Sequence, residues 1–171
     1  MHNAAFAALG WDAMYLALDV APDKLLSVLT SLQDMGFAGV NLTIPHKEVA
    51  FRGLKHLDES ARLLGAVNTV RFTADGPVGF NTDGFGFLRA VEESFGRSPK
   101  GDHVFVLGSG GAGRAVSLMA ASVGAASVTL ADLDLARCES VAAEIKKLFP
   151  QVKAHVASNR DAQREAIQKA D

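Results

Sequence analysis

A lysine and an aspartate on separate predicted turns are the first residues of this sequence that could carry chemistry. Lys47 follows a short β-like run and Pro45, and Asp83 comes directly after Asn81-Thr82. A lysine amine can exchange a proton with a hydroxyl or carbonyl oxygen, and a carboxylate beside it can orient the amine. Each residue also has an ordinary interpretation, because most lysines are solvated and Asp83 could cap the helix that follows it.

A third polar candidate stands at the start of another predicted strand. Asn68 lies in the stretch Leu64-Gly65-Ala66-Val67-Asn68-Thr69-Val70. Its spacing alone does not separate a functional amide from a turn or cap residue. Polar residues at three successive strand tips nevertheless predict a shared cleft.

The glycine-rich turn Gly108-Ser109-Gly110-Gly111-Ala112-Gly113 separates a short apolar run, His103–Leu107, from an alanine-rich stretch with helical spacing. This order predicts strand, turn and helix. Asp132 ends the next β-branched run, about 20 residues beyond the turn, where a βαβ nucleotide fold places the acid that binds the adenosine ribose. The flanking elements favour dinucleotide binding over a plain glycine-rich turn.

Each glycine of this turn has a mechanical role in that interpretation. Gly108 permits the tight turn after the strand, Gly110 lets the backbone approach a pyrophosphate, and Gly113 lets the helix pack closely on the strands. The free N–H groups at the start of the helix, around Gly111 and Ala112, would face the phosphates.

The elements before residue 97 predict an α/β module. A short helix at Met1–Phe6 and a strand at Met14–Val20 come first, and an amphipathic helix then runs from Pro22 to Gly36, with its inner stripe at Leu25, Leu26, Leu29, Leu32 and Met35. A second strand at Gly39–Thr43 completes a β, α, β order, which is typical of a small parallel sheet. The turn Asp75-Gly76 predicts a hairpin between residues 67–73 and 77–80.

A polar segment with glycine and proline, Gly96–Asp102, separates this part from the nucleotide module. Beyond Asp132 we expect a helix from about residue 134 to 149, a strand at 152–156 and a helix at about 159–169. The expected architecture is therefore α/β, with a substrate module at residues 1–97 and a Rossmann-type dinucleotide-binding module at 102–171.

Composition excludes several classes of protein. The chain has 171 residues, 49% of them hydrophobic and 21% charged, and a net charge of −2 without a basic cluster, which argues against a nucleic-acid partner. The sequence has no apolar run long enough to predict a membrane span. The single cysteine, Cys138, fits a reducing, cytoplasmic compartment. The five histidines are scattered without metal-ligand spacing, so we expect no metal.

Four segments, in this order, resemble the signatures of shikimate dehydrogenases. They are Asn41-Leu42-Thr43-Ile44-Pro45-His46-Lys47, Gly65-Ala66-Val67-Asn68-Thr69, Asn81-Thr82-Asp83-Gly84 and the glycine-rich turn. The resemblance implies an enzyme that interconverts shikimate and 3-dehydroshikimate by hydride exchange with a nicotinamide. It implies that Lys47 and Asp83 are the catalytic pair, and that Thr43 and Asn68, with Asp83, bind the substrate's hydroxyls.

The segment after the second nucleotide strand departs from NADP-dependent members of the family, many of which carry an Asn-Arg-Thr-like sequence there. This chain has Asp132-Leu133-Asp134. A carboxylate accepts hydrogen bonds from the ribose diol but repels a 2′-phosphate, by roughly 1–4 kcal/mol per charge pair at 4 Å. We therefore expect NAD to be preferred over NADP. The same pattern resembles the NAD-dependent quinate/shikimate branch, so quinate is a second expected substrate.

The ends of the chain also differ from the family pattern. The resemblance implies a first strand with a Ser-x-Ser segment before Met1, and a fourth nucleotide strand with closing helices after Asp171, so both modules are expected to be incomplete and this chain alone inactive. Two alternatives stay open, a non-catalytic nucleotide-binding remnant and an aminoshikimate-type dehydrogenase. The oligomeric state is not readable from the sequence.

Overall fold

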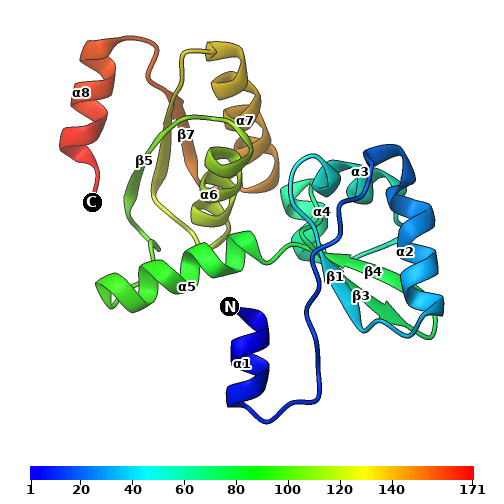
Figure 1. The fold of residues 1–171 in the computed structure, drawn as a ribbon. Helices are drawn as coiled ribbons and strands as arrows, with labels where there is room; N and C mark the ends of the chain where they lie inside the picture. Colours follow the sequence, from blue (N-terminus) through cyan, green and yellow to red (C-terminus); the bar gives the residue numbers. More distant parts are fainter.

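The computed structural model describes residues 1–171 as two α/β modules that are joined by the helix α5 (Asp83–Phe95) (Figure 1). The first module contains a four-stranded sheet in the order β1 (Gly39–Asn41), β3 (Thr69–Thr73), β4 (Gly76–Phe80) and β2 (His56–Leu57). The second contains a three-stranded sheet in the order β5 (His103–Leu107), β6 (Ser127–Ala131) and β7 (Lys153–Val156). The α/β expectation is confirmed.

The sheet of the first module is mixed, not parallel. Strand β1 pairs antiparallel with β3, where Val40 lies opposite Val70, and β3 pairs with β4 in the predicted hairpin. Only the two-residue strand β2 runs parallel to its neighbour, β4. The parallel prediction was wrong because a strand of the later hairpin, and not the segment that precedes α2, pairs with β1.

The predicted strand at Met14–Val20 is absent, although the segment lies extended between α1 (His2–Ala8) and the first module (Figure 1). Its backbone has no strand partner. Instead, Tyr15 N donates to Asn3 Oδ1 at 2.6 Å, and Asn3 Nδ2 donates to Tyr15 O at 3.0 Å. A strand is defined by its hydrogen-bonded neighbour, so an apolar run alone does not produce one.

Three helices cover the core of the first module. They are α2 (Leu25–Asp34), which follows the short 3-10 helix η1 (Pro22–Lys24), α3 (His46–Gly53) and α4 (Glu59–Leu64). Leu25 and Leu29 of α2 are buried in a cluster with alanines of α3 and α4 and with valines next to and in β3. Leu26 and Met35, which we expected on the inner stripe, are 40% and 71% exposed. Leu26 lies at the edge of the core, against Gly53 of α3, and Met35 follows the last residue of α2.

The second module has the expected Rossmann-type order. Helix α6 (Gly111–Ser122) connects β5 to β6, and α7 (Leu135–Leu148) connects β6 to β7, with all strand pairs parallel; α8 (Arg160–Lys169) follows β7. Its core cluster of 14 buried residues is centred on β6, whose Val128, Leu130 and Ala131 have no exposed surface. A parallel strand covered on both faces is buried in this way along its length.

Helix α5 contacts both modules close to its first residue. A Cβ added to Gly84 would lie 2.7 Å from Met119 of α6 and 2.9 Å from Leu64 of α4. The helix ends at Phe95, where Gly96 takes a left-handed conformation, with φ of 68°, and a short turn then leads into β5. The segment that was predicted to separate the modules therefore follows the end of α5. The modules touch at the beginning of α5.

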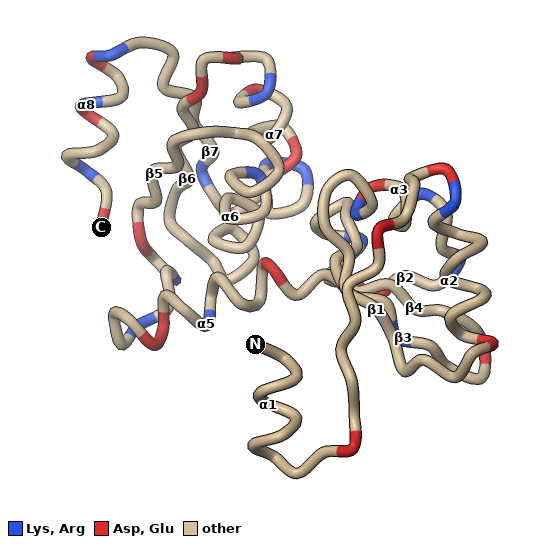
Figure 2. The backbone as a smooth tube through the Cα atoms, in the orientation of Figure 1, with Lys and Arg blue, Asp and Glu red and all other residues tan.

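Acidic and basic residues are both present on the surface of each module (Figure 2). Several form pairs within one helix, such as Arg52 with Glu48 at 2.6 Å and Lys169 with Glu165 at 2.6 Å. Pairs of this kind contribute only tenths of a kcal/mol each. No helix of the chain has the length and apolar character that a membrane span needs. No cluster of three or more histidine, cysteine or acidic side chains has a geometry suited to a metal ion.

Candidate active site

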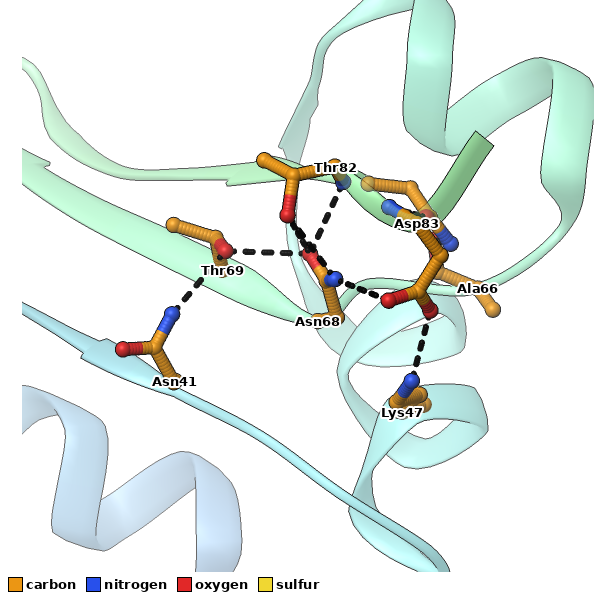
Figure 3. A network of polar contacts seen from close by, with 8 residues as sticks. Asn41, Lys47, Ala66, Asn68, Thr69, Thr82 and Asp83 are labelled. Carbon is orange, nitrogen blue, oxygen red and sulfur yellow. Dashed lines mark hydrogen bonds and ion pairs between the residues drawn. The ribbon is translucent and has the colours of Figure 1, made fainter. Parts of the chain in front are cut away.

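Lys47 and Asp83, which are 36 residues apart in sequence, form an ion pair with 2.6 Å between Nζ and Oδ2 (Figure 3). Lys47 lies in the first turn of α3, as the sequence predicted. Its backbone carbonyl accepts a hydrogen bond from Val67 N at 3.0 Å, which fixes α3 to the chain just before Asn68. The side chains are 26% and 49% exposed, so an oxygen of a small molecule can reach the pair.

Asp83 is the first residue of α5, not its cap. Thr82 occupies the N-cap position, and the carboxylate of Asp83 turns toward Lys47. Its amide donates to Asn81 Oδ1 at 3.0 Å, which holds the start of the helix. An anion in the first turn is also favoured by the helix dipole.

Asn68 holds the other oxygen of the same carboxylate. Its Nδ2 donates to Asp83 Oδ1 at 2.8 Å and to Thr82 Oγ1 at 3.0 Å, while its Oδ1 accepts from Thr82 N at 3.0 Å. The residue is buried, with 8% of its surface exposed. Asp83 is thus held from two sides, by an amide and by an ammonium, which leaves its rotamer little freedom (Figure 3).

The network continues through three residues that the sequence did not single out, Thr69, Asn41 and Tyr15. Thr69 Oγ1 donates to Asn68 Oδ1 at 3.0 Å, Asn41 Nδ2 donates to Thr69 Oγ1 at 3.1 Å, and Tyr15 Oη donates to Asn41 Oδ1 at 3.2 Å. Asn41 had a signal, because residues two apart on a strand share a face and Thr43 was a candidate. Thr69 had none beyond its place next to Asn68.

The glycine-rich turn has the geometry that its sequence predicted. Gly108 has φ of 98°, a left-handed conformation that side chains disfavour, and a Cβ at Gly113 would lie 1.7 Å from the carbonyl oxygen of Gly108. Gly110 and Gly111, in contrast, have nothing within 4 Å of an added Cβ. Their missing side chains therefore leave open space in front of α6.

Helix α6 starts in this open space without a side-chain cap. The first N–H groups of a helix have no partner inside it and favour an anion. Asp132, directly after β6, lies beside the turn, since its Oδ2 accepts from Ser109 N at 2.6 Å. The hydrogen bond from the amide of Asp134, and then that from Ser109, hold the pKa of the Asp132 carboxyl below its usual value of 3.8. The turn and this carboxylate together suit the phosphates and the ribose of a dinucleotide.

A cavity of about 980 Å³ brings the two groups of residues together. Lys47 and Asp83 line it from the first module, and Gly110, Gly111 and Ala112 line it from the second. Arg114 and Arg137 are also on its wall and were not among the sequence-predicted site residues.

The wall of this cavity does not include five of the predicted site residues, Thr43, Asn68, Gly108, Gly113 and Asp132. Thr43 lines a neighbouring groove of about 500 Å³, which is mostly apolar and meets the larger cavity at Ile44 and Pro45. Asn68 lies behind Asp83 and is not part of the cavity wall. The structure therefore brings together the lysine, the aspartate and the glycine-rich turn, with Thr43 to one side.

Comparison with known proteins agrees with this geometry. A family model described as the shikimate dehydrogenase substrate binding domain matches residues 1–70. A shikimate dehydrogenase (NADP(+)) of Methanopyrus kandleri is 47% identical over 147 residues, which are 86% of this chain and 51% of the relative. The chain thus spans about half the length of the curated relatives that it matches.

Two solved structures have closely similar folds. Shikimate 5-dehydrogenase from Listeria monocytogenes, in complex with shikimate and NAD, superimposes with a TM-score of 0.90 at 31% identity, over 99% of this chain and 60% of that one. Quinate dehydrogenase from Corynebacterium glutamicum, in complex with NAD, gives a TM-score of 0.83 at 32% identity, over 99% of this chain and 62% of that one. In sequence, in fold and in the order of its site segments, this chain is therefore similar to shikimate dehydrogenases, over about half to three fifths of their length.

Proposed function

We propose that the protein containing this chain is an oxidoreductase that interconverts shikimate and 3-dehydroshikimate by hydride exchange with a nicotinamide dinucleotide. The observation that carries the proposal is the Lys47–Asp83 pair, 2.6 Å apart, on the wall of a cavity that the glycine-rich turn also lines. The activity named for the Methanopyrus kandleri relative, which is 47% identical, supports the same reaction.

The pair is suited to move one proton. Oxidation of a secondary alcohol removes a hydride from carbon and a proton from oxygen, and the Lys47 amine takes that proton when the hydroxyl lies within hydrogen-bond reach. In the opposite direction the Lys47 ammonium donates it to the carbonyl oxygen. Asp83 holds the amine in place and stabilises its charged form, while Asn68 holds Asp83.

The second module offers the binding site for the dinucleotide, which, when bound, supplies the hydride chemistry. The residues that would hold it are Gly108, Gly110, Gly111, Ala112 and Gly113 around the start of α6, with Asp132 at the ribose. The open space at Gly110 and Gly111 and the uncapped N-terminus of α6 support this assignment.

NAD is the dinucleotide that we propose as preferred. Asp132 places a negative charge where a 2′-phosphate would lie, and its lowered pKa keeps that charge at neutral pH. The Listeria and Corynebacterium structures contain NAD, in line with this choice. The Methanopyrus relative and other curated relatives are named for NADP(+), which supports NADP as the alternative, and the charge of Asp132 is the reason for placing NAD first.

Quinate is a second candidate substrate. The fold similarity to the Corynebacterium quinate dehydrogenase favours it, and both molecules are cyclic hydroxy acids. Thr43 and Asn68 are proposed to bind hydroxyl groups of either ring. Because the Asn68 amide is already shared with Asp83 and Thr82, a substrate hydroxyl would replace its contact with Thr82.

The two modules have different roles in this proposal. Residues 1–97 hold the substrate and the proton-transfer pair, and residues 102–171 hold the dinucleotide. The reducing environment implied by the single, buried Cys138 fits a cytoplasmic enzyme.

A spectrophotometric assay of the natural protein tests the proposal. Shikimate and quinate are each offered with NAD and with NADP, for the wild type and for Lys47→Ala. We expect shikimate-dependent reduction of NAD, and a fall in kcat of roughly 10²–10⁴-fold in the variant, which is the usual contribution of a general acid–base group.

Lys55→Ala is the matched control, because Lys55 is an exposed lysine just after α3 that has no contact with the pair. It should retain wild-type kcat. Dinucleotide binding by the wild type without turnover of either substrate would contradict the enzyme assignment and favour a non-catalytic nucleotide-binding protein.

A further inference from the structure

One arginine connects the two modules beside the cavity. Arg114 Nη1 donates to the backbone carbonyl of Leu64, the last residue of α4, at 2.5 Å. Its Nε and Nη2 donate to the two carboxylate oxygens of Glu144 on α7, at 2.8 and 2.5 Å. Arg114 itself lies in the first turn of α6, directly after the glycine-rich turn. The guanidinium therefore binds one helix of the first module and one of the second.

The geometry of these contacts makes the connection rigid. Two parallel hydrogen bonds between a guanidinium and a carboxylate fix the plane of both groups. Only 28% of the Arg114 side chain and 29% of that of Glu144 are exposed, so solvent competes weakly. The carbonyl of Leu64 stands at the negative end of α4, where a cation is favoured. A Cβ at Gly65 would be in ordinary contact with Nη1, at 3.5 Å, so the glycine is required by its left-handed φ of 63° and not by the space that Arg114 needs.

The chain after Leu64 leads directly to the proton-transfer pair. Ala66 O accepts a hydrogen bond from Asn81 Nδ2 at 3.0 Å, and Asn81 Oδ1 in turn accepts from Asp83 N at 3.0 Å. Asn68, two residues further, binds the Asp83 carboxylate at 2.8 Å. The segment that Arg114 fixes at one end thus holds Asp83 at the other.

From these contacts we propose that Arg114 is a positioning residue, which sets the separation between the glycine-rich turn and the Lys47–Asp83 pair. The expected effect on kcat rests on the proposed function. The expected effect on the separation of the modules does not. Lysine cannot replace arginine here, since one ammonium cannot reach the Glu144 carboxylate in the same bidentate way and bind Leu64 O as well.

The kinetic test compares Arg114→Gln and Arg114→Lys with the wild type in the natural protein. We expect Arg114→Gln to lower kcat roughly ten- to a hundredfold, the cost of displacing reacting groups by about 1 Å. The deuterium isotope effect on kcat, for substrate labelled at the carbon that loses hydride, should rise because hydride transfer becomes slower. Arg114→Lys should recover part of kcat.

Arg89→Gln is the matched control. Arg89 forms a surface pair with Glu93 within α5, and 64% of its side chain is exposed. If Arg114→Gln leaves kcat and the isotope effect as they are in Arg89→Gln, or if melting temperature falls while both stay unchanged, Arg114 is a structural residue only and the proposal is wrong.

A distance measurement separates this proposal from the proposed function. Spin labels at Lys55→Cys and Lys153→Cys report the separation of the modules, and Cys138 is buried and should not react. Arg114→Gln should shift or broaden the distance distribution, whereas Arg89→Gln should not. A change without any wild-type turnover supports the connection and overturns the dehydrogenase assignment. An unchanged distribution overturns the connection whatever the activity.

Discussion

In the proposed function, the choice of dinucleotide depends on the carboxylate of Asp132. Asp132→Asn keeps an oxygen that can accept from Ser109 N but removes the charge. We expect the ratio of kcat/KM for NAD to that for NADP to fall by about tenfold or more, because 1.4 kcal/mol of lost repulsion corresponds to one factor of ten. Steady-state kinetics with both dinucleotides measures it.

The pH dependence of this preference follows from the direction of the pKa shift. Hydrogen bonds from Asp134 N and Ser109 N keep the pKa of Asp132 below 3.8, so its charge is constant at neutral and mildly acidic pH and is lost only in strong acid. Asp132 should therefore cause no change in the wild-type preference between about pH 5 and pH 8, and any change in that range should follow the 2′-phosphate of NADP, whose second pKa is about 6. Asp161→Asn, an exposed change in α8, serves as control, and an unaltered preference in Asp132→Asn would contradict this role.

Single residues also mark the limit of what sequence reasoning can predict. Lys47 and Asp83 were candidates by residue type, but it was the family resemblance that assigned them as a catalytic pair, since nothing in a separation of 36 residues says that two side chains will meet at 2.6 Å. The sequence did not reveal that the Asn68 amide holds Asp83, beside the substrate contact that was predicted for it. Arg114 carried no signal, because its partners come from α4 and α7 and only tertiary packing brings them together.

At the scale of one element, we expect two glycines at the start of α6 to have different roles. Gly113 is needed for folding, and Gly110 for the proposed binding of a dinucleotide. Gly113→Ala forces a Cβ to within 1.7 Å of the carbonyl of Gly108, and backbone cannot easily give way. We expect it to lower the free energy of unfolding by at least about 3 kcal/mol, as measured by denaturant titration.

Gly110→Ala is the counterpart, because nothing lies within 4 Å of a Cβ there. It should unfold like the wild type but bind dinucleotide at least about tenfold more weakly by calorimetry, since the Cβ occupies the space that a pyrophosphate needs. Equal affinity for dinucleotide in Gly110→Ala and wild type would show that the open space is not a phosphate site.

Elements built from local signals were predicted well, and elements that need a distant partner were not. The β5–α6–β6 order followed from apolar runs around a glycine-rich turn, and its parallel register is as expected. Met14–Val20 had a similar apolar pattern but no neighbouring strand, so it stays extended. The antiparallel pairing of β1 with β3 joins residues about 30 apart along the chain, which periodicity cannot reveal.

For the molecule as a whole, the relative position of the modules decides whether the site works. The modules touch next to the proposed proton-transfer pair, because Gly84 directly follows Asp83 and packs on Met119 and Leu64. The same junction contains Arg114 and its bond to Leu64 O. A shift of one module relative to the other would therefore displace Asp83. The substrate and the dinucleotide would then no longer be aligned with each other.

Gly84→Ala tests this junction, with Gly86→Ala two residues further along α5 as the matched control. A Cβ at Gly84 would lie 2.7 Å from Met119, whereas nothing lies within 4 Å of one at Gly86. Gly86→Ala should raise the free energy of unfolding by up to about 1 kcal/mol through helix propensity. Gly84→Ala should instead lower it by about 1–3 kcal/mol through overpacking, and lower kcat as Asp83 moves.

The double variant Gly84→Ala, Met119→Ala distinguishes overpacking from a direct effect on Asp83. Removing the Met119 side chain beyond Cβ takes away Cγ and Sδ, the two nearest atoms that the new methyl group meets, and leaves Leu64 Cδ1 at 2.9 Å. If the junction positions the pair, kcat recovers toward the wild-type value although the cavity left by methionine costs stability of its own. In that case kcat rises while stability falls. A kcat that merely follows the fraction of folded protein would instead show that the contact at Gly84 contributes to stability and not to the alignment of the site.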